Sequence, residues 1–133
     1  MPPNKPNRRK KIREIAESYL KELGLTRWKL TSIYLGIPDH MLETLNKNYP
    51  EAKNGFDGCV WVTTPFKFLM AIDNEVSEDD LPTVIGHEIT HILLNNLYEA
   101  TQVNRPSHRT ILKHLEIACN RVGRLVARRR KEL

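Results

Sequence analysis

The hydrophobic positions along the chain divide it into helical and extended stretches. From Lys10 to Leu23 the apolar side chains recur every three or four residues, as in an amphipathic helix, and Gly24 follows as a C-terminal stop. These apolar positions are Ile12, Ile15, Ala16, Tyr19, Leu20 and Leu23. Residues 1–9 are rich in Pro and Asn and lack this periodicity, so we expect them to form a disordered tail. The sequence therefore predicts a first helix that follows a short tail.

Three shorter stretches have the composition of β-strands. Trp28 to Leu35 is rich in β-forming residues with partial alternation, and it ends before a Gly-Ile-Pro turn. Two runs, Cys59 to Thr63 and Phe68 to Asp73, are separated by a turn that contains Pro65, which predicts a β-hairpin. Between the first strand and this hairpin, Asp39 is expected to cap a short helix.

The C-terminal half predicts two further helices. Ser77 and Asp80 match a capping box, and Pro82 suits the first turn of the helix that follows. That helix is apolar on most sides, which is typical of a helix through the middle of a core; its apolar residues are Leu81, Val84, Ile85, Ile89, Ile92, Leu93 and Leu97. A connection of unassigned structure, Asn95 to Arg105, then leads to a last helix capped by Ser107. The order of elements predicts an α+β domain.

Length and composition limit the class of protein. A chain of 133 residues is long enough for one core, and we expect residues 10–133 to form a single domain. The chain has no apolar run long enough to cross a membrane, and its basic N-terminus lacks the apolar segment of a secretory signal, so we expect a cytoplasmic protein. Cys59 and Cys119 lie in apolar segments and are interpreted as small core residues in a reducing compartment.

The net charge of +5 is concentrated near the two ends of the chain, in residues 8–11 and 128–131. Basic runs of this kind can bind the phosphates of a nucleic acid, but they are more often the solvated surface of a helix. The sequence contains no zinc-finger spacing and no recognizable aromatic stacking platform. A nucleic acid is therefore an alternative partner to the substrate that the motif described below suggests.

The strongest chemical signal is the spacing His-Glu-x-x-His, formed by His87, Glu88 and His91. On a helix, residues four apart lie on the same face, so both imidazoles can bind one metal ion. The carboxylate of Glu88 then lies beside the metal, where it can act as the general base that deprotonates a metal-activated water. The pattern predicts a zinc-dependent hydrolase; the competing interpretation is two core histidines hydrogen-bonded to the backbone.

A catalytic zinc site needs a further protein ligand and one open position. The downstream candidates are His108, His114 and Glu116. On a helical projection, Glu116 lies on one flank of the apolar stripe of the last helix and His114 on the other. Periodicity alone does not choose between them, because an exposed Glu116 could equally pair with a neighbouring cation.

From about Gly58 to Val126, half of the chain resembles the compact zincin metallopeptidases called minigluzincins, including the ImmA/IrrE type and small phage-encoded relatives. In that family a strand pair precedes the His-Glu-x-x-His helix, and a later helix supplies a glutamate in a spaced pattern. The residues that match this pattern are Glu116, Cys119, Asn120, Val122 and Gly123. The resemblance implies that Glu116 is the third metal ligand, supported by Asn120, in a zincin-like α+β fold with a small antiparallel or mixed sheet.

The function that this resemblance implies is a zinc metallopeptidase that hydrolyses peptide bonds. His87, His91 and Glu116 would hold Zn²⁺, and Glu88 would be the general base. The partner would be a protein or peptide substrate, which in the family lies as an extended strand against the sheet edge beside the helix; here that edge would be Phe68 to Asp73 or its neighbour. The alternatives are a zincin-like metal-containing binding protein without peptidase activity and a basic nucleic-acid-associated protein.

Overall fold

The computed structural model describes residues 5–50, 55–94, 116, 119–125 and 128 with their side chains, and the backbone of residues 95–100. It has an α+β fold. The elements, in chain order, are α1 (Lys5–Glu22), β1 (Lys29–Leu35), α2 (Asp39–Asn48), β2 (Gly58–Thr64), β3 (Lys67–Ile72) and α3 (Leu81–Ala100). Residues 116 and 119–125 are also helical and form what we call the C-terminal helical segment. No helix in this described part of the chain is both long and apolar enough to cross a membrane.

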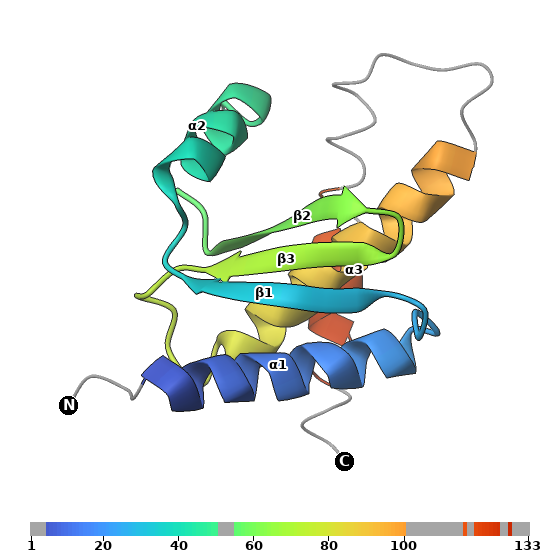
Figure 1. Ribbon diagram of the computed structural model, residues 1–133, viewed down its shortest axis with the longest axis horizontal. Helices are drawn as coiled ribbons and strands as arrows, with labels where there is room; N and C mark the ends of the chain where they lie inside the picture. Colours follow the sequence, from blue (N-terminus) through green and yellow to red (C-terminus); the bar gives the residue numbers. More distant parts are fainter. Residues whose placement is uncertain (1–4, 51–54, 101–115, 117–118, 126–127, 129–133) are drawn as a thin grey trace.

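The three strands form one mixed sheet in the order β1-β3-β2 (Figure 1). β3 pairs with β2 in antiparallel fashion and with β1 in parallel fashion. The predicted first strand and the predicted hairpin are therefore confirmed. Because β3 is the central strand, however, the expectation that Phe68 to Asp73 could be a free sheet edge is wrong: both sides of that strand are already hydrogen-bonded. The edges are its neighbours, β1 and β2.

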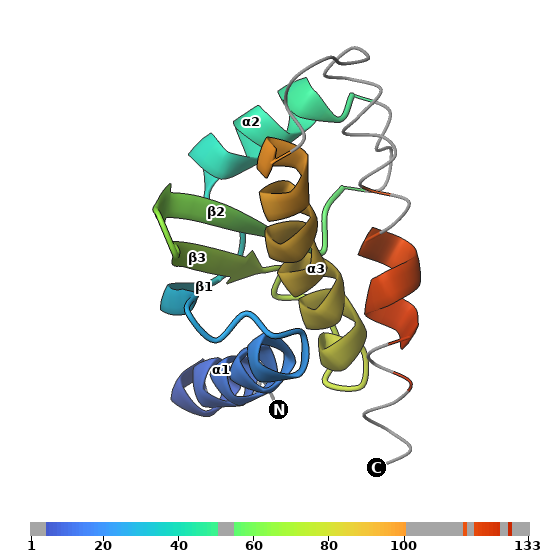
Figure 2. The same cartoon turned by 90° about the vertical axis from the view of Figure 1, so that its right-hand side faces the viewer.

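One face of the sheet carries the main core, whereas the opposite face is covered only in part, and the alternation along β3 separates the two. Phe68, Met70 and Ile72 are fully buried in the main core, together with residues of α1 and α3. Ala71 points to the opposite face, where it forms a smaller cluster with Met41 of α2. Figures 1 and 2 show α3 packed against the sheet, α1 alongside β1 and α2 beyond β2. Each fully buried large side chain contributes roughly 1.5–3 kcal/mol, so the main core dominates.

The first helix begins earlier than its apolar pattern predicts. It starts at Lys5, so the expected disordered tail over residues 1–9 is wrong for residues 5–9. Arg8 is the physical reason, because its side chain is only 5% exposed and is held by the loop between β3 and α3. Hydrophobic periodicity does not detect a helix turn that is anchored by a buried cation.

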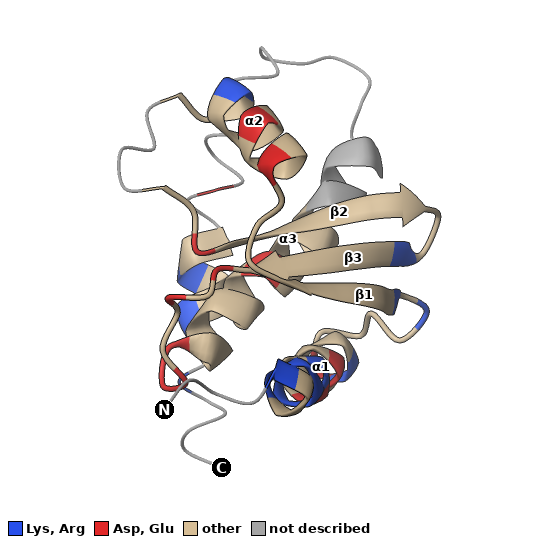
Figure 3. Ribbon diagram, turned by 60° about the vertical axis from the view of Figure 1, so that its left-hand side comes forward, with Lys and Arg blue, Asp and Glu red and all other residues tan. Residues whose placement is uncertain are grey.

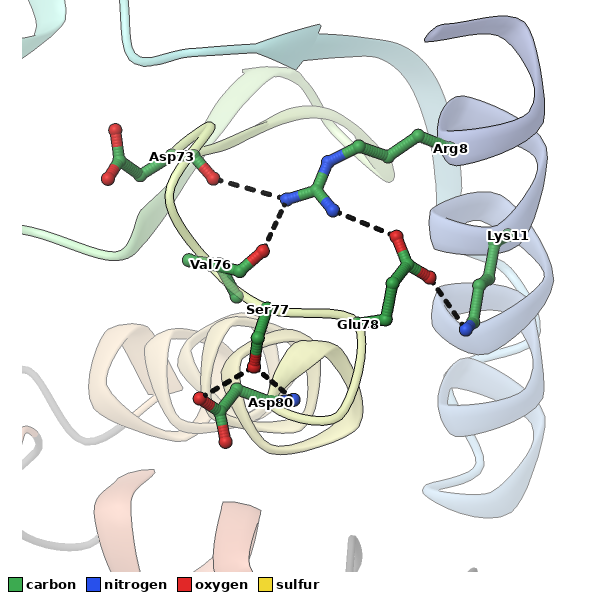
Figure 4. A network of polar contacts seen from close by, with 7 residues as sticks. All are labelled: Arg8, Lys11, Asp73, Val76, Ser77, Glu78 and Asp80. Atoms are coloured by element: carbon green, nitrogen blue, oxygen red, sulfur yellow. Dashed lines mark hydrogen bonds and ion pairs between the residues drawn. The ribbon is translucent and has the colours of Figure 1, made fainter. Parts of the chain in front are cut away.

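Figure 4 shows the polar network around Arg8. Its guanidinium donates to the backbone carbonyls of Val76, at 2.8 Å, and Asp73, at 3.3 Å, and forms an ion pair with Glu78 at 3.0 Å. Lys11 also contacts Glu78, at 2.7 Å. The hydrogen bond from Lys11, and to a smaller extent the one from Arg8, lowers the pKa of the Glu78 carboxyl below its usual value. α1 is thereby tied to the loop that leads into α3.

Other element boundaries also differ from the predictions. Pro38 precedes α2 as its N-cap and Asp39 is the first helical residue, so the predicted Asp39 cap is wrong. The predicted pairing of Ser77 with Asp80 is present just before α3: the Ser77 hydroxyl accepts from the Asp80 amide at 3.3 Å and contacts its carboxylate at 3.0 Å. α3 continues to Ala100, past the expected end near Asn95. The predicted Ser107 cap lies outside the described residues.

The two edges of the sheet differ in their chemistry. On β1, the backbone carbonyl of Leu30 accepts a hydrogen bond from Arg13 at 2.7 Å, and that of Ile33 accepts one from Arg9 at 3.3 Å. Both arginines come from α1, so this helix covers the β1 edge and protects it against pairing with another strand. Among the described residues β2 pairs with β3 alone. Within this part of the chain, the β2 edge is therefore the open one.

Candidate metal centre

Two histidines of α3 aim their rings at the same point. His87 and His91 are one helical turn apart, and their Nε2 atoms lie 3.2 Å from each other. Their side chains are 19% and 23% exposed, so the site is sheltered but accessible. The orientation of α3 is fixed here because neighbouring residues such as Ile85 and Ile89 are fully buried in the main core. The histidine face of α3 is therefore fixed by the packing of its other faces.

Glu116, from the C-terminal helical segment, completes this arrangement. Its two carboxylate oxygens lie 2.9 Å from the Nε2 atom of His87 and 3.0 Å from that of His91. Although burial alone would raise the pKa of Glu116, the hydrogen bonds from the two histidines lower it to about 2. The carboxylate is thus held in its ionised form, which is the form that binds a metal.

The donor set fits a zinc ion. Ligand atoms placed tetrahedrally at the usual zinc distance of about 2.0–2.1 Å lie roughly 3.3 Å from one another. The three separations between His87, His91 and Glu116 are 2.9–3.2 Å, only slightly shorter. Two imidazoles and one carboxylate also match the donors that catalytic zinc prefers. Small rotations of the side chains are enough to remove the difference between these separations and the ideal ones.

Glu88 lies beside this cluster but is placed differently. A group of three residues that could hold a metal can also be drawn from His87, Glu88 and His91, whose donor atoms lie within 4.8 Å of one another. The Glu88 carboxylate, however, is 3.7 Å from the His87 Nε2 atom, whereas the carboxylate of Glu116 contacts both histidines directly. Of the two carboxylates, Glu116 is therefore the better placed to complete a metal site with the histidines, and Glu88 lies next to it.

The surroundings of Glu88 favour a role in proton transfer. The residue is only 5% exposed, and burial raises the pKa of its carboxyl, although the nearby histidines oppose this shift. The charges of Glu116 and Asp57 raise it further. A carboxyl whose pKa lies above its usual value is a better proton acceptor once ionised, because it binds the proton more tightly.

Asn120 supports the first histidine. It follows Glu116 by one helical turn, and its side chain forms a hydrogen bond with the His87 ring. Burial lowers the pKa of His87, but the hydrogen bonds that its ring makes to Glu116 and Asn120, together with the charge of Glu88, raise it above its usual value overall. A hydrogen bond from outside the cluster fixes the orientation of a ligating imidazole, and Asn120 is placed to do so.

Two glycines allow the two helical elements to approach closely. A Cβ atom added to Gly123 would lie 2.8 Å from the backbone nitrogen of His87 and 2.9 Å from its Cα atom. A Cβ atom added to Gly86 would lie 3.2 Å from the Gly123 carbonyl oxygen and from the Tyr19 ring. At Gly123 only a residue without a side chain permits this crossing, and at Gly86 a side chain would be tight. The crossing therefore sets how near Glu116 comes to the histidines.

Replacing Gly123 with Ala should weaken zinc binding about ten-fold or more, the size of effect seen when residues that support metal ligands are changed. The added methyl group meets rigid backbone, so the C-terminal helical segment must move away and take Glu116 with it. Calorimetric titration with zinc would measure the change. Arg124→Ala, an exposed change one residue away, is the matched control; equal affinities in both variants would contradict the proposed role of the crossing.

The structure brings together the candidates that the motif and the resemblance identified: His87, Glu88, His91, Glu116 and Asn120. The other two possible ligands, His108 and His114, lie outside the described residues.

Sequence reasoning missed Asp57 and Gly86. Nothing in a linear pattern relates Asp57, in the loop before β2, to a helix that begins more than twenty residues later. A glycine directly before the motif, in the middle of a helix, was the available signal for close packing at Gly86. Cys59 and Cys119 are buried, as predicted, and burial raises the pKa of both thiols, that of Cys59 to about 12.

Comparison with known proteins gives no match to a family model, to a curated protein or to a solved structure. The interpretation of the site therefore depends on its own geometry.

Proposed function

We propose that this protein is a zinc-dependent peptidase of the zincin-like, minigluzincin-related type. The observation that carries the proposal is the position of Glu116, whose two oxygens contact the Nε2 atoms of His87 and His91 at 2.9 and 3.0 Å. Two histidines and a carboxylate that converge from separate helices make a three-ligand set. Such a set leaves one position of a tetrahedral metal free for water or substrate, which distinguishes catalytic from structural zinc sites.

Zinc bound by these residues would supply Lewis acidity, which activates water and polarises a carbonyl group. The remaining chemistry belongs to the chain. Glu88 accepts a proton from the attacking water on its carboxylate and delivers it to the departing amine. Its burial next to the histidines keeps bulk water away from this proton. Glu116 stays ionised throughout, and Asn120 holds the His87 ring in place.

An extended peptide is the substrate class that the sheet accommodates best. The edge of β1 is covered by Arg9 and Arg13, whereas β2 has no second neighbouring strand among the described residues and packs next to α3. At the start of β2, a Cβ atom added to Gly58 would lie 3.4 Å from Val84, one helical turn before His87. A peptide strand added to β2 would therefore run past the candidate centre.

The proposal is tested by the metal content of the purified chain. We expect about one zinc per folded chain by elemental analysis, removed by a chelator and restored by added zinc. Circular dichroism on the same samples would show that the chain is folded. A folded chain that takes up no zinc after reconstitution would refute the proposal, and a failed assay on one generic protein substrate would not.

A further inference from the structure

One end of the sheet carries a cluster of cations that the basic runs of the sequence do not predict. Arg27, in the loop before β1, and Lys29 and Lys67, the first residues of β1 and β3, lie together at this end. All three side chains are exposed. Figure 3 shows these basic positions at the start of β1 and β3, away from the acidic loop at the opposite end of the sheet. We call Arg27, Lys29, Phe66 and Lys67 the hairpin-end surface.

The two lysines are arranged in a way that opposes stability. Lys29 and Lys67 are direct register partners on neighbouring strands, so their like charges lie side by side. None of the ion pairs found among the described residues involves Arg27, Lys29 or Lys67. The cluster therefore presents positive charge that is not neutralised by the described part of the chain.

The hairpin turn adds an exposed aromatic ring to these cations. Phe66 is 40% exposed and has a φ of 66°, in the left-handed region that a β-turn with Pro before it normally fills with Gly or Asn. The backbone carbonyl of Phe66 accepts a hydrogen bond from the Lys29 amide at 2.8 Å, which holds the strained turn against β1. A phenylalanine in this position costs stability that a glycine would not.

The ring is held in a fixed orientation. The guanidinium carbon of Arg27 lies 4.6 Å from the centre of the Phe66 ring, over one face. The ring of Trp28 packs edge-on against it with the centroids 5.5 Å apart. A rigid, partly exposed ring with an arginine stacked on it offers a flat surface next to three cations. Sequence spacing did not reveal this platform, because its residues come from two segments nearly forty positions apart.

We propose that the hairpin-end surface binds single-stranded nucleic acid. Its three cations contact the phosphates, and a base stacks on the exposed part of the Phe66 ring. Charge complementarity requires an anionic partner. The aromatic platform favours a nucleic acid over an acidic peptide, because every base has a π-face and a carboxylate has none. This surface lies at the end of the sheet where β1 and β3 begin, whereas β3 ends at the loop that enters α3. Binding there is independent of the proposed zinc centre.

The test is fluorescence anisotropy of a labelled oligothymidylate of about 12 nucleotides, titrated with the full chain at several salt concentrations. The combined variant Arg27→Ala, Lys29→Ala and Lys67→Ala should bind more weakly and should lower the slope of log affinity against log salt by about 2, since each phosphate contact contributes roughly 0.7 on a single strand. The matched control, Lys5→Ala, Lys10→Ala and Lys21→Ala, removes the same charge from exposed positions of α1. Equal losses in the two triple variants would overturn the proposal.

A second variant separates stacking from charge. Phe66→Gly removes the ring and relieves the positive φ, so the fold should be kept. It should weaken binding of the oligothymidylate about five-fold or more, and leave unchanged the binding of an abasic strand of the same length. A chain that bound the abasic strand or poly-glutamate as tightly as the oligothymidylate would carry only a general polyanion surface, and the proposal would be wrong. Zinc content, measured in parallel, should be the same in all variants.

Discussion

Replacing Glu116 with Ala should weaken zinc binding by more than about 100-fold, beyond the usual effect of losing a residue that merely supports a ligand. The reason is geometric: the Glu116 carboxylate is in direct contact with both histidines, so the variant retains only two of three donors. The loss should exceed that caused by Gly123→Ala, which displaces the carboxylate but keeps it. Competition with a chromogenic chelator would measure the affinities of the wild type and the variant.

The control for this prediction is Glu43→Ala, which removes an exposed carboxylate from α2. It should leave zinc affinity unchanged, because α2 packs through Met41 into a cluster separate from the one that holds α3. The outcome that would contradict the assignment is specific. If Glu116→Ala kept its zinc and Glu88→Ala lost it, the metal would be held by His87, Glu88 and His91, the other grouping that the distances permit.

The elements with strong local signals could be predicted from the sequence. The hairpin was recognizable because two runs of β-forming residues flank a short turn, and α3 because its apolar residues surround a motif that requires a helix. The strand order was not predictable in the same way. Which of three short strands lies in the centre depends on tertiary packing, and here the last strand in the sequence inserts between the other two.

The N-terminal helix shows what periodicity cannot detect. Its first turn is fixed by Arg8, a residue that hydrophobic patterns assign to solvent, because buried charges are rare and need partners. Those partners, two backbone carbonyls and Glu78, come from a loop more than sixty residues later. Only the folded chain brings them within reach.

The proposed third ligand, Glu116, could not be predicted from periodicity either. A helical projection left Glu116 and His114 nearly equivalent, and the resemblance alone favoured Glu116. The structure adds a physical cause, since the contact between Gly86 and Gly123 brings the C-terminal helical segment against α3 with Glu116 facing the histidines. A close helix crossing depends on two small residues from distant segments, so neither glycine reveals it alone.

Replacing Glu88 with Gln should abolish peptide hydrolysis while leaving zinc binding intact. Gln has the same shape as Glu, and the three proposed ligands, His87, His91 and Glu116, are unchanged. The metal content should therefore stay at the wild-type level. The amide cannot accept the proton of the attacking water. Loss of a general base typically lowers the rate by about 100- to 10,000-fold, and we expect a fall within that range. Mass spectrometry of a peptide library digested by each protein would measure it.

The thermal stability of the metal-free variant shows whether a loss of activity comes from unfolding or from the missing base. Burial raises the pKa of the Glu88 carboxyl in the folded state, so this group opposes folding increasingly as the pH rises above the ordinary carboxyl pKa. Glu88→Gln removes that penalty, and its thermal midpoint at neutral pH should be equal to or higher than that of the wild type.

Asp57→Asn is the matched control for the charge change, because Asp57 interacts electrostatically with Glu88 but is exposed. It should keep most of the activity, since it alters the pKa of the base without removing it. A Glu88→Gln protein that cleaved the same peptides at the wild-type rate would remove Glu88 from the reaction. If zinc binding were retained in that case, the centre would be a metal site without this general base, and the peptidase mechanism would have to be abandoned.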